Sequence, residues 1–215
     1  MKTKNTFLLI ELIILFLLLP SVLVFDISPF IKMGAILPGI VYVIYTAVLS
    51  KKITRKSLYF ISIKSNWKIV LIRYFALVIF TTVLIYLFKN EDLFIVVKKN
   101  PLMWISIFLF YSIFSVYPQE FLYRSFFFMR YQQLFKSKYF LIAVNAVLFS
   151  LAHVGFKSIL VMVLTLFGGF IFALTYHKTK SLLFTSIEHA LYGSWLFTVG
   201  LGEMLAFPGP DVGVI

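Results

Sequence analysis

Three carboxylates and two histidines lie inside long apolar runs of this sequence, where charged and polar side chains are rare. Glu120 is followed four residues later by Arg124, which is the favourable order for an ion pair on one helix face. His153 and His189 lie in two later apolar runs. Because a charge in the bilayer core costs at least about 2.5–3.5 kcal/mol, such residues usually have partners and a function.

A glutamate and two histidines that meet in an apolar cavity have the groups that hydrolysis needs, a base that activates water and donors that stabilise an oxyanion. The same set could also bind a divalent metal such as zinc, although the ligands come from separate helices without HExxH spacing. Depth can be counted from the inner end of each helix at about 1.5 Å per residue. On this count Glu120 and His153 lie roughly 21–23 Å from the inner ends, and His189 lies roughly 14 Å from its inner end. Tilted helices would therefore bring them together.

The other two carboxylates in apolar runs are Glu11 and Glu188. Glu11 lies near the start of the first run with only Lys4 nearby, so we interpret it as snorkelling to the interface or lining a cavity, outside the site. Glu188 precedes His189 and stays a candidate base. His177 lies beside two lysines at the end of a run and is interpreted as interfacial.

The composition excludes an ordinary soluble domain. The chain has 215 residues, 61% of them hydrophobic and 13% charged, whereas soluble domains average about 45–50% apolar and about 25% charged residues. The length accommodates roughly seven or eight spans of about 20 residues. We therefore predict an all-α, polytopic transmembrane helical bundle that forms one membrane-embedded domain, residues 1–215. The absence of cysteine excludes disulfides and thiolate chemistry.

One apolar run is longer than a single span, because Pro118 is the only helix breaker between residues 102 and 135. A continuous helix of that length would be about 50 Å long and would tilt, kink or protrude, which places Glu120 within the bilayer. The core that carries the candidate residues is expected at residues 102–201. The apolar runs cover residues 7–25, 33–50, 69–88, 102–117, 139–156, 159–176 and 182–201.

The net charge of +12 comes from Lys and Arg residues between the apolar runs. With the N-terminus inside, most of them fall on the inner side, as the positive-inside rule requires. We therefore expect contact with anionic lipid headgroups and no binding of nucleic acid. The basic segment 51–68 is predicted to be an inner loop against the headgroups, and the tail 207–215 is predicted to be irregular.

Three short motifs occur in order between residues 119 and 193: PQEFLYR, FSLAH and HALYG. Together they resemble the EExxxR, FxxxH and HxxxN motifs of the CPBP intramembrane protease family, which includes the Rce1-type CAAX prenyl endopeptidases and bacterial Abi-like proteins. The resemblance implies peptide-bond hydrolysis in the membrane, on a membrane peptide or a lipidated protein. It also implies an integral protein of the bacterial plasma (inner) membrane.

In that family the first motif glutamate and the FxxxH histidine are thought to activate water, while the last histidine and asparagine stabilise the oxyanion. The resemblance therefore gives His153 the water-activating role and His189 the oxyanion role, with Arg124 orienting the glutamates. Two positions depart from the pattern. Gln119 replaces the first glutamate, and an amide is not a base. Gly193 stands where asparagine is common.

Three hypotheses follow. The first is a membrane protease, with zinc as a candidate metal and Glu120 or Glu188 as an alternative base. The second is a catalytically inactive relative that acts as a membrane scaffold, for which Gln119 is the best evidence. The third is a small proton-coupled carrier with the glutamate and the two histidines as a relay. Against the carrier, no internal repeat is visible, and Gly168–Gly169 more simply permits close helix packing.

Overall fold

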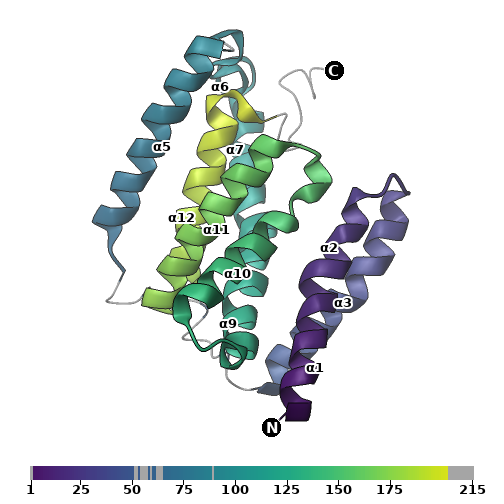
Figure 1. Ribbon diagram of the computed structural model, residues 1–215. Helices are drawn as coiled ribbons and strands as arrows, with labels where there is room; N and C mark the ends of the chain where they lie inside the picture. Colours follow the sequence, from purple (N-terminus) through teal and green to yellow (C-terminus); the bar gives the residue numbers. More distant parts are fainter. Residues whose placement is uncertain are drawn as a thin grey trace.

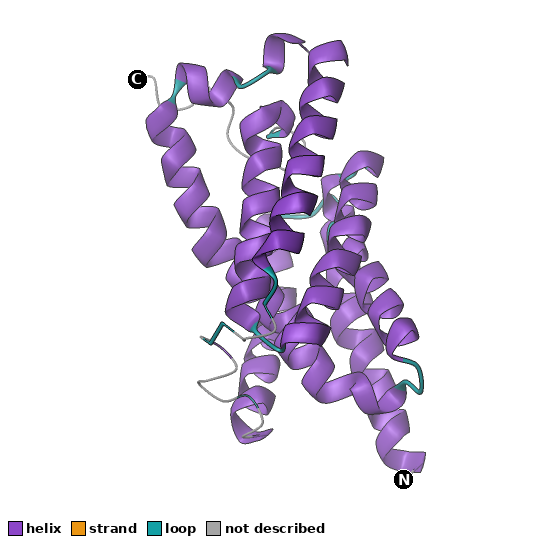
Figure 2. Ribbon diagram, turned by 90° about the vertical axis from the view of Figure 1, so that its left-hand side faces the viewer, coloured by secondary structure: helices purple, strands orange, loops and turns teal. Residues whose placement is uncertain are grey.

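The computed structural model describes residues 2–50, 53, 58, 60–61, 65–88 and 90–202. In this part of the chain all regular structure is helical (Figures 1 and 2), which confirms the predicted helical bundle. Most of the predicted loop 51–68 and all of the tail 207–215 lie outside the described residues.

The helices alternate in direction along the bundle (Figure 1). Among the described residues, six helices are long and apolar enough to cross a membrane. The helices are α1 (Lys2–Ile13), α2 (Leu19–Ser21), α3 (Pro29–Ser50), α5 (Trp67–Phe88), α6 (Ile95–Lys99), α7 (Pro101–Phe110), α8 (Tyr117–Glu120), α9 (Phe127–Tyr131), α10 (Lys138–Leu151), α11 (Ile159–Thr179) and α12 (Leu182–Leu196).

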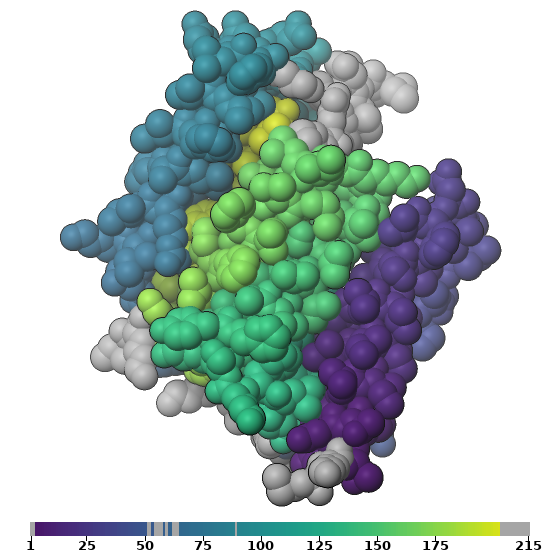
Figure 3. Space-filling view, viewed as in Figure 1, coloured from purple at the N-terminus to yellow at the C-terminus, as the bar shows by residue number. Residues whose placement is uncertain are grey.

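Helix α12 lies in the middle of the bundle between α5 and α11, and only strips of it are visible in the space-filling view (Figure 3). It continues into a π-helical segment, Phe197–Leu201, so the predicted run 182–201 is helical up to a kink at Gly200, where φ is 117° and ψ is 9°. The outer helices instead expose large apolar side chains, such as Val48 on α3 and Ile79 on α5. An apolar exterior around a more polar central helix is the arrangement expected in lipid.

Residues Pro101–Leu134 form one helix of 34 residues, as the sequence predicts. Pro118 lies inside it and has no backbone N–H to donate. On either side of Pro118 the backbone widens into π-helical segments, Tyr111–Val116 and Phe121–Phe126. Such π segments often occur at functional sites, because they turn side chains onto a new face. Glu120 is therefore a mid-helix residue.

Helices α10 and α11 pack closely because Gly169 has no side chain. A Cβ atom at this position would lie 3.0 Å from the Cα and 3.1 Å from the carbonyl oxygen of Ala146 on α10. The interpretation of Gly168–Gly169 as a packing feature is thus correct at Gly169. This contact fixes α10, which leads directly into His153.

Glu11 does not snorkel, because it is buried in an ion pair with Arg130. Its two carboxylate oxygens accept hydrogen bonds from Arg130 Nε (2.8 Å) and Nη2 (2.6 Å). The hydroxyl groups of Tyr42 (2.6 Å) and Tyr131 (2.8 Å) also donate to it. Glu11 therefore joins α1 to α3 and to the end of the long helix. Sequence spacing could not show this, since its cation lies 119 residues away.

Candidate active site

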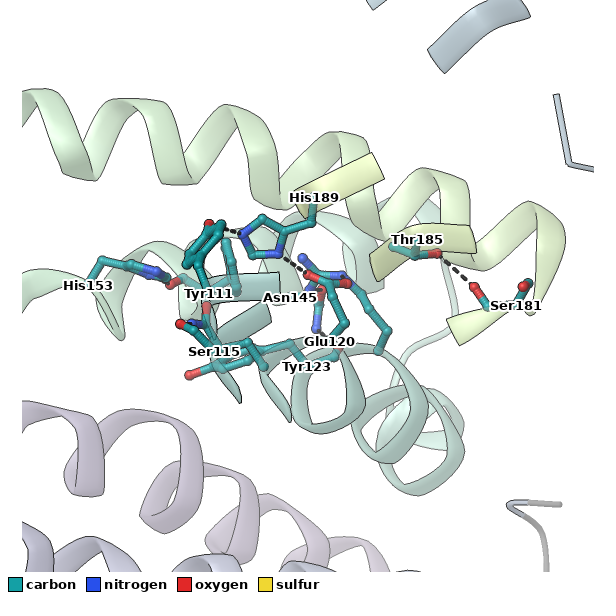
Figure 4. A network of polar contacts seen from close by, with 12 residues as sticks. Tyr111, Ser115, Glu120, Tyr123, Asn145, His153, Ser181, Thr185 and His189 are labelled. Carbon is teal, nitrogen blue, oxygen red and sulfur yellow. Dashed lines mark hydrogen bonds and ion pairs between the residues drawn. The ribbon is translucent and has the colours of Figure 1, made fainter. Parts of the chain in front are cut away.

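The predicted site residues come from three parts of the bundle and meet in its interior (Figure 4). Gln119 and Glu120 lie on α8, and Arg124 lies in the π segment that follows. His153 lies two residues after the end of α10, and His189 lies near the middle of α12. These side chains therefore lie close together, as their predicted depths along the helices indicate.

Glu120 contacts both His189 and Arg124 at the centre of the site. Its Oε1 accepts a hydrogen bond from His189 Nδ1 at 2.9 Å, and its Oε2 lies 3.1 Å from Arg124 Nε. Both Glu120 and Arg124 are completely buried. Because a carboxylate only accepts hydrogen bonds, the proton of a neutral His189 is held on Nδ1.

Arg124 is held by a residue that the sequence analysis missed, Asn145 on α10. Arg124 Nη1 donates to Asn145 Oδ1 (2.5 Å), and Asn145 Nδ2 donates to the carbonyl oxygen of Tyr123 (2.7 Å). The guanidinium carbon also lies 4.8 Å from the centre of the Phe149 ring, a cation–π contact. A signal for Asn145 existed, since it is a lone amide four residues before the FSLAH motif.

His153 is oriented by the first residue of its own motif. Its Nδ1 lies 2.8 Å from the carbonyl oxygen of Phe149, so Nδ1 carries the proton and donates it. The ring stacks on Phe156, with centroids 5.9 Å apart and planes 17° apart. Nε2 is then the unprotonated nitrogen, and within the described part of the chain no hydrogen-bond partner for it is found. His153 therefore has a proton acceptor available at the cavity.

His189 has a different neighbour on its second nitrogen. Nε2 lies 3.2 Å from the hydroxyl oxygen of Tyr111, which the sequence analysis did not select. The imidazole stacks on Phe172, with centroids 4.5 Å apart. Figure 4 shows His189 between Tyr111 and Glu120, with one contact on each side. A tyrosine eight residues before Gln119, on the same helix, is the sequence signal for Tyr111.

Gln119 faces the same space as the two histidines. Its Nε2 donates to Ser115 Oγ at 2.8 Å. Its Oε1 is buried and has no hydrogen-bond partner among the described residues. The amide that replaces the first motif glutamate thus lines the cavity but is not a base, and its Oε1 is buried beside the cavity.

A cavity of about 720 Å³ connects these groups. It is large enough for a peptide segment or an extended apolar group. Its walls are mostly apolar, while its polar lining includes Tyr111, Ser115, Gln119, His153 and His189. Neither of the two glutamates proposed as a base is among the lining residues.

Glu188 points away from this cavity although it precedes His189. Its Oε1 accepts hydrogen bonds from Arg73 Nη1 on α5 (3.2 Å) and from the Tyr192 hydroxyl (2.9 Å). The carboxylate is completely buried. Glu188 thus connects α12 to α5 and does not line the cavity.

The donor set does not fit a zinc site. Among the described residues, no group of three His, Cys, Asp or Glu side chains could hold a metal ion. The carboxylate of Glu120 is already bound to His189 and Arg124, and position 119 offers an amide. Structural and catalytic zinc sites need at least three protein ligands. Zinc stays a prediction of the sequence, and no step below depends on it.

Comparison with known families agrees with this geometry. Residues 101–195 match the family model "Type II CAAX prenyl endopeptidase Rce1-like". This segment is therefore similar to Rce1-like endopeptidases. The predicted resemblance is thereby confirmed over the part of the chain that begins with α7 and ends in α12. No curated protein and no solved structure matches the chain.

The matched segment contains every residue of the site described above, including Tyr111 and Asn145. Among the described residues before it, the helical run Thr3–Val24, which contains α1 and α2, and the helices α3 and α5 are also long and apolar enough to span a membrane. The chain is thus an integral membrane protein that is similar to a protease family over residues 101–195.

Proposed function

We propose that this protein is an endopeptidase that hydrolyses a peptide bond within the membrane, with His153 as the general base. One observation carries the proposal. The Nδ1 proton of His153 is held by the Phe149 carbonyl oxygen, which leaves Nε2 as a proton acceptor beside a cavity that also contains His189. A neutral imidazole at a water-accessible cavity is the usual form of a general base.

The reaction requires one water and no other reactant. His153 Nε2 takes a proton from the water while the water oxygen bonds to the peptide carbonyl carbon, and the C=O electron pair moves to the carbonyl oxygen. When this tetrahedral species collapses, the C–N bond breaks. His153 returns its proton to the leaving nitrogen, so the products are a carboxylic acid and an amine.

Glu120 acts in this scheme as a positioning residue. It is absent from the cavity wall, and both of its oxygens face groups that hold it. Through the 2.9 Å contact to Nδ1 it fixes the orientation and the tautomer of His189. Arg124 supplies the opposite charge that makes a buried carboxylate tolerable.

Gln119 holds the water that His153 deprotonates. A small rotation of its side chain would bring the buried, unpartnered Oε1 to the cavity, where it accepts one hydrogen bond from that water and leaves the second water proton for His153. An amide orients the water but takes no proton, so this site has one base where a glutamate at position 119 would provide two.

The substrate is proposed to be a membrane peptide or a lipidated protein. The mostly apolar wall of the 720 Å³ cavity suits an apolar chain attached to a peptide. A prenylated CAAX-type C-terminus is the class that the name of the matched family suggests. We also propose that the protein lies in a bacterial plasma membrane with its N-terminus inside, because the basic residues favour that side.

Cleavage by purified protein tests the proposal. Internally quenched peptides, one farnesylated at a CAAX C-terminus and one with a transmembrane segment, would be presented in liposomes. His153→Ala should lower kcat by about 10²–10⁴-fold, the usual contribution of a general base. His177→Ala is the matched control, because His177 is the remaining histidine and does not line the cavity.

Gln119→Glu is the second variant, and it should raise kcat because it adds a carboxylate beside the water. Equal background rates for the wild type and His153→Ala on both peptides would refute the protease proposal and favour the inactive scaffold. Uptake of a solute into liposomes that is lost in His153→Ala would instead favour the carrier.

A further inference from the structure

Gly193 and Tyr111 fit each other as a pair. A Cβ atom at Gly193 would lie 2.1 Å from the Tyr111 hydroxyl oxygen, 2.7 Å from Cζ and 2.8 Å from Cε1. These distances are far below van der Waals contact, so the ring edge of Tyr111 lies directly on the backbone of α12. Any residue larger than glycine at position 193 would displace the tyrosine.

The space left by this glycine places the hydroxyl group beside His189. Tyr111 Oη lies 3.2 Å from His189 Nε2, and both side chains line the cavity. The two rings meet edge to face, with their planes 85° apart. The hydroxyl is therefore fixed in position, while its hydrogen can rotate about the Cζ–Oη bond toward a second acceptor.

The protonation of His189 determines which group can donate. Glu120 accepts a hydrogen bond from the Nδ1–H group of His189. A neutral His189 therefore carries no proton on Nε2. An oxyanion near Nε2 then receives no hydrogen bond from the imidazole itself. The Tyr111 hydroxyl is the donor in contact with that nitrogen.

We infer that Tyr111 is a catalytic residue whose hydroxyl donates a hydrogen bond to the oxyanion of the tetrahedral species, at the place where Gly193 offers no side chain. The inference rests on the proposed function. In the resting site the hydroxyl donates to His189 Nε2, and as charge develops on the carbonyl oxygen it turns to that oxygen. A preorganised donor in a mostly apolar cavity stabilises such charge strongly.

The first test is the kinetics of Tyr111→Phe on the same quenched peptides, with Tyr117→Phe as the control. Loss of one oxyanion donor typically lowers kcat about 10²–10³-fold. KM should change little, because the bond forms only in the transition state. Tyr117 lies on the same long helix but does not line the cavity, so its variant should retain the wild-type rate.

The second test moves the hydrogen-bond donor from Tyr111 to position 193 on α12. Gly193→Asn alone should lose activity because its Cβ displaces Tyr111. In the double variant Tyr111→Ala/Gly193→Asn the ring is gone, and the asparagine amide can donate from α12. We expect it to be at least about tenfold faster than Tyr111→Ala, a partial return of one donor. A merely structural tyrosine would show no such rescue.

The outcomes separate the two claims. If Tyr111→Phe retains wild-type kcat while His153→Ala loses it, the tyrosine inference is overturned and the protease proposal stands. If the wild type is no faster than His153→Ala, both are overturned. Should Tyr111→Phe fail to fold, Gly193→Ala displaces the hydroxyl in its place, and a wild-type rate in that variant overturns the inference.

Discussion

The buried pair of Glu120 and Arg124 gives the sharpest stability prediction. Glu120→Gln keeps the size of the side chain but removes its charge. The amide oxygen can still accept from His189 Nδ1, while the amide nitrogen then faces Arg124 Nε, at the position that is now 3.1 Å from a carboxylate oxygen. Two donors would meet, and the guanidinium would be left without its counter-charge.

The magnitude follows from burial, because both side chains are completely inaccessible. Removing one partner of a buried pair costs about 3–5 kcal/mol in the free energy of unfolding. For a protein of 150–250 residues each kcal/mol shifts Tm by about 2–4 °C, so the expected fall is about 6–20 °C. Glu91→Gln is the control, since Glu91 is exposed and its loss should stay within about 0.5 kcal/mol.

The assay is thermal unfolding in detergent micelles, followed by circular dichroism, for Glu120→Gln, Arg124→Met and the double variant. The double variant removes both charges, so its loss of stability should be smaller than the sum of the two single losses by at least about 1 kcal/mol. Losses that add within about 0.5 kcal/mol would refute the coupling. Activity should stay low in the double variant, because His189 has lost its carboxylate.

Two further predictions concern helix packing and metal dependence. Gly169→Ala should lower the free energy of unfolding by about 1–3 kcal/mol, since its Cβ would lie 3.0 Å from Ala146 Cα; Gly34→Ala, whose Cβ meets nothing within 4 Å, should not. Chelation with EDTA or 1,10-phenanthroline should leave the cleavage rate unchanged because the donor set does not fit zinc. A loss that added Zn²⁺ restores would contradict this and support the metal prediction.

Much of the fold was predictable because its strongest determinant is local. Long apolar runs can satisfy their backbone groups in lipid only as helices, so the spans and the continuous helix through Pro118 follow from sequence. The π segments around Pro118 were not predictable, since their widened backbone depends on packing against α12 and the other helices. Glu11 was misjudged for a similar reason, because its partner Arg130 lies 119 residues away along the chain.

The sequence predicted which residues form the candidate site, but not which side chains contact each other. Motif order and depth along the helices indicate that Glu120, His153 and His189 meet. They do not indicate that Glu120 binds His189 Nδ1, or that Glu188 faces α5, because a rotation about the helix axis decides each contact. Tyr111 is part of no motif, and only the close approach to Gly193 reveals it.

The replacement at position 119 therefore has a different meaning in the structure than in the sequence. Sequence alone associates Gln119 with a lost base, and it leaves open whether Glu120 or Glu188 replaces that base or the protein is catalytically inactive. In the proposed mechanism the proton acceptor is His153 Nε2 and the oxyanion donor is the Tyr111 hydroxyl, so neither of these two groups belongs to residue 119. Gln119 reduces the number of bases that can take a proton from the attacking water from two to one. The site should consequently hydrolyse with one base, at a rate that Gln119→Glu can raise.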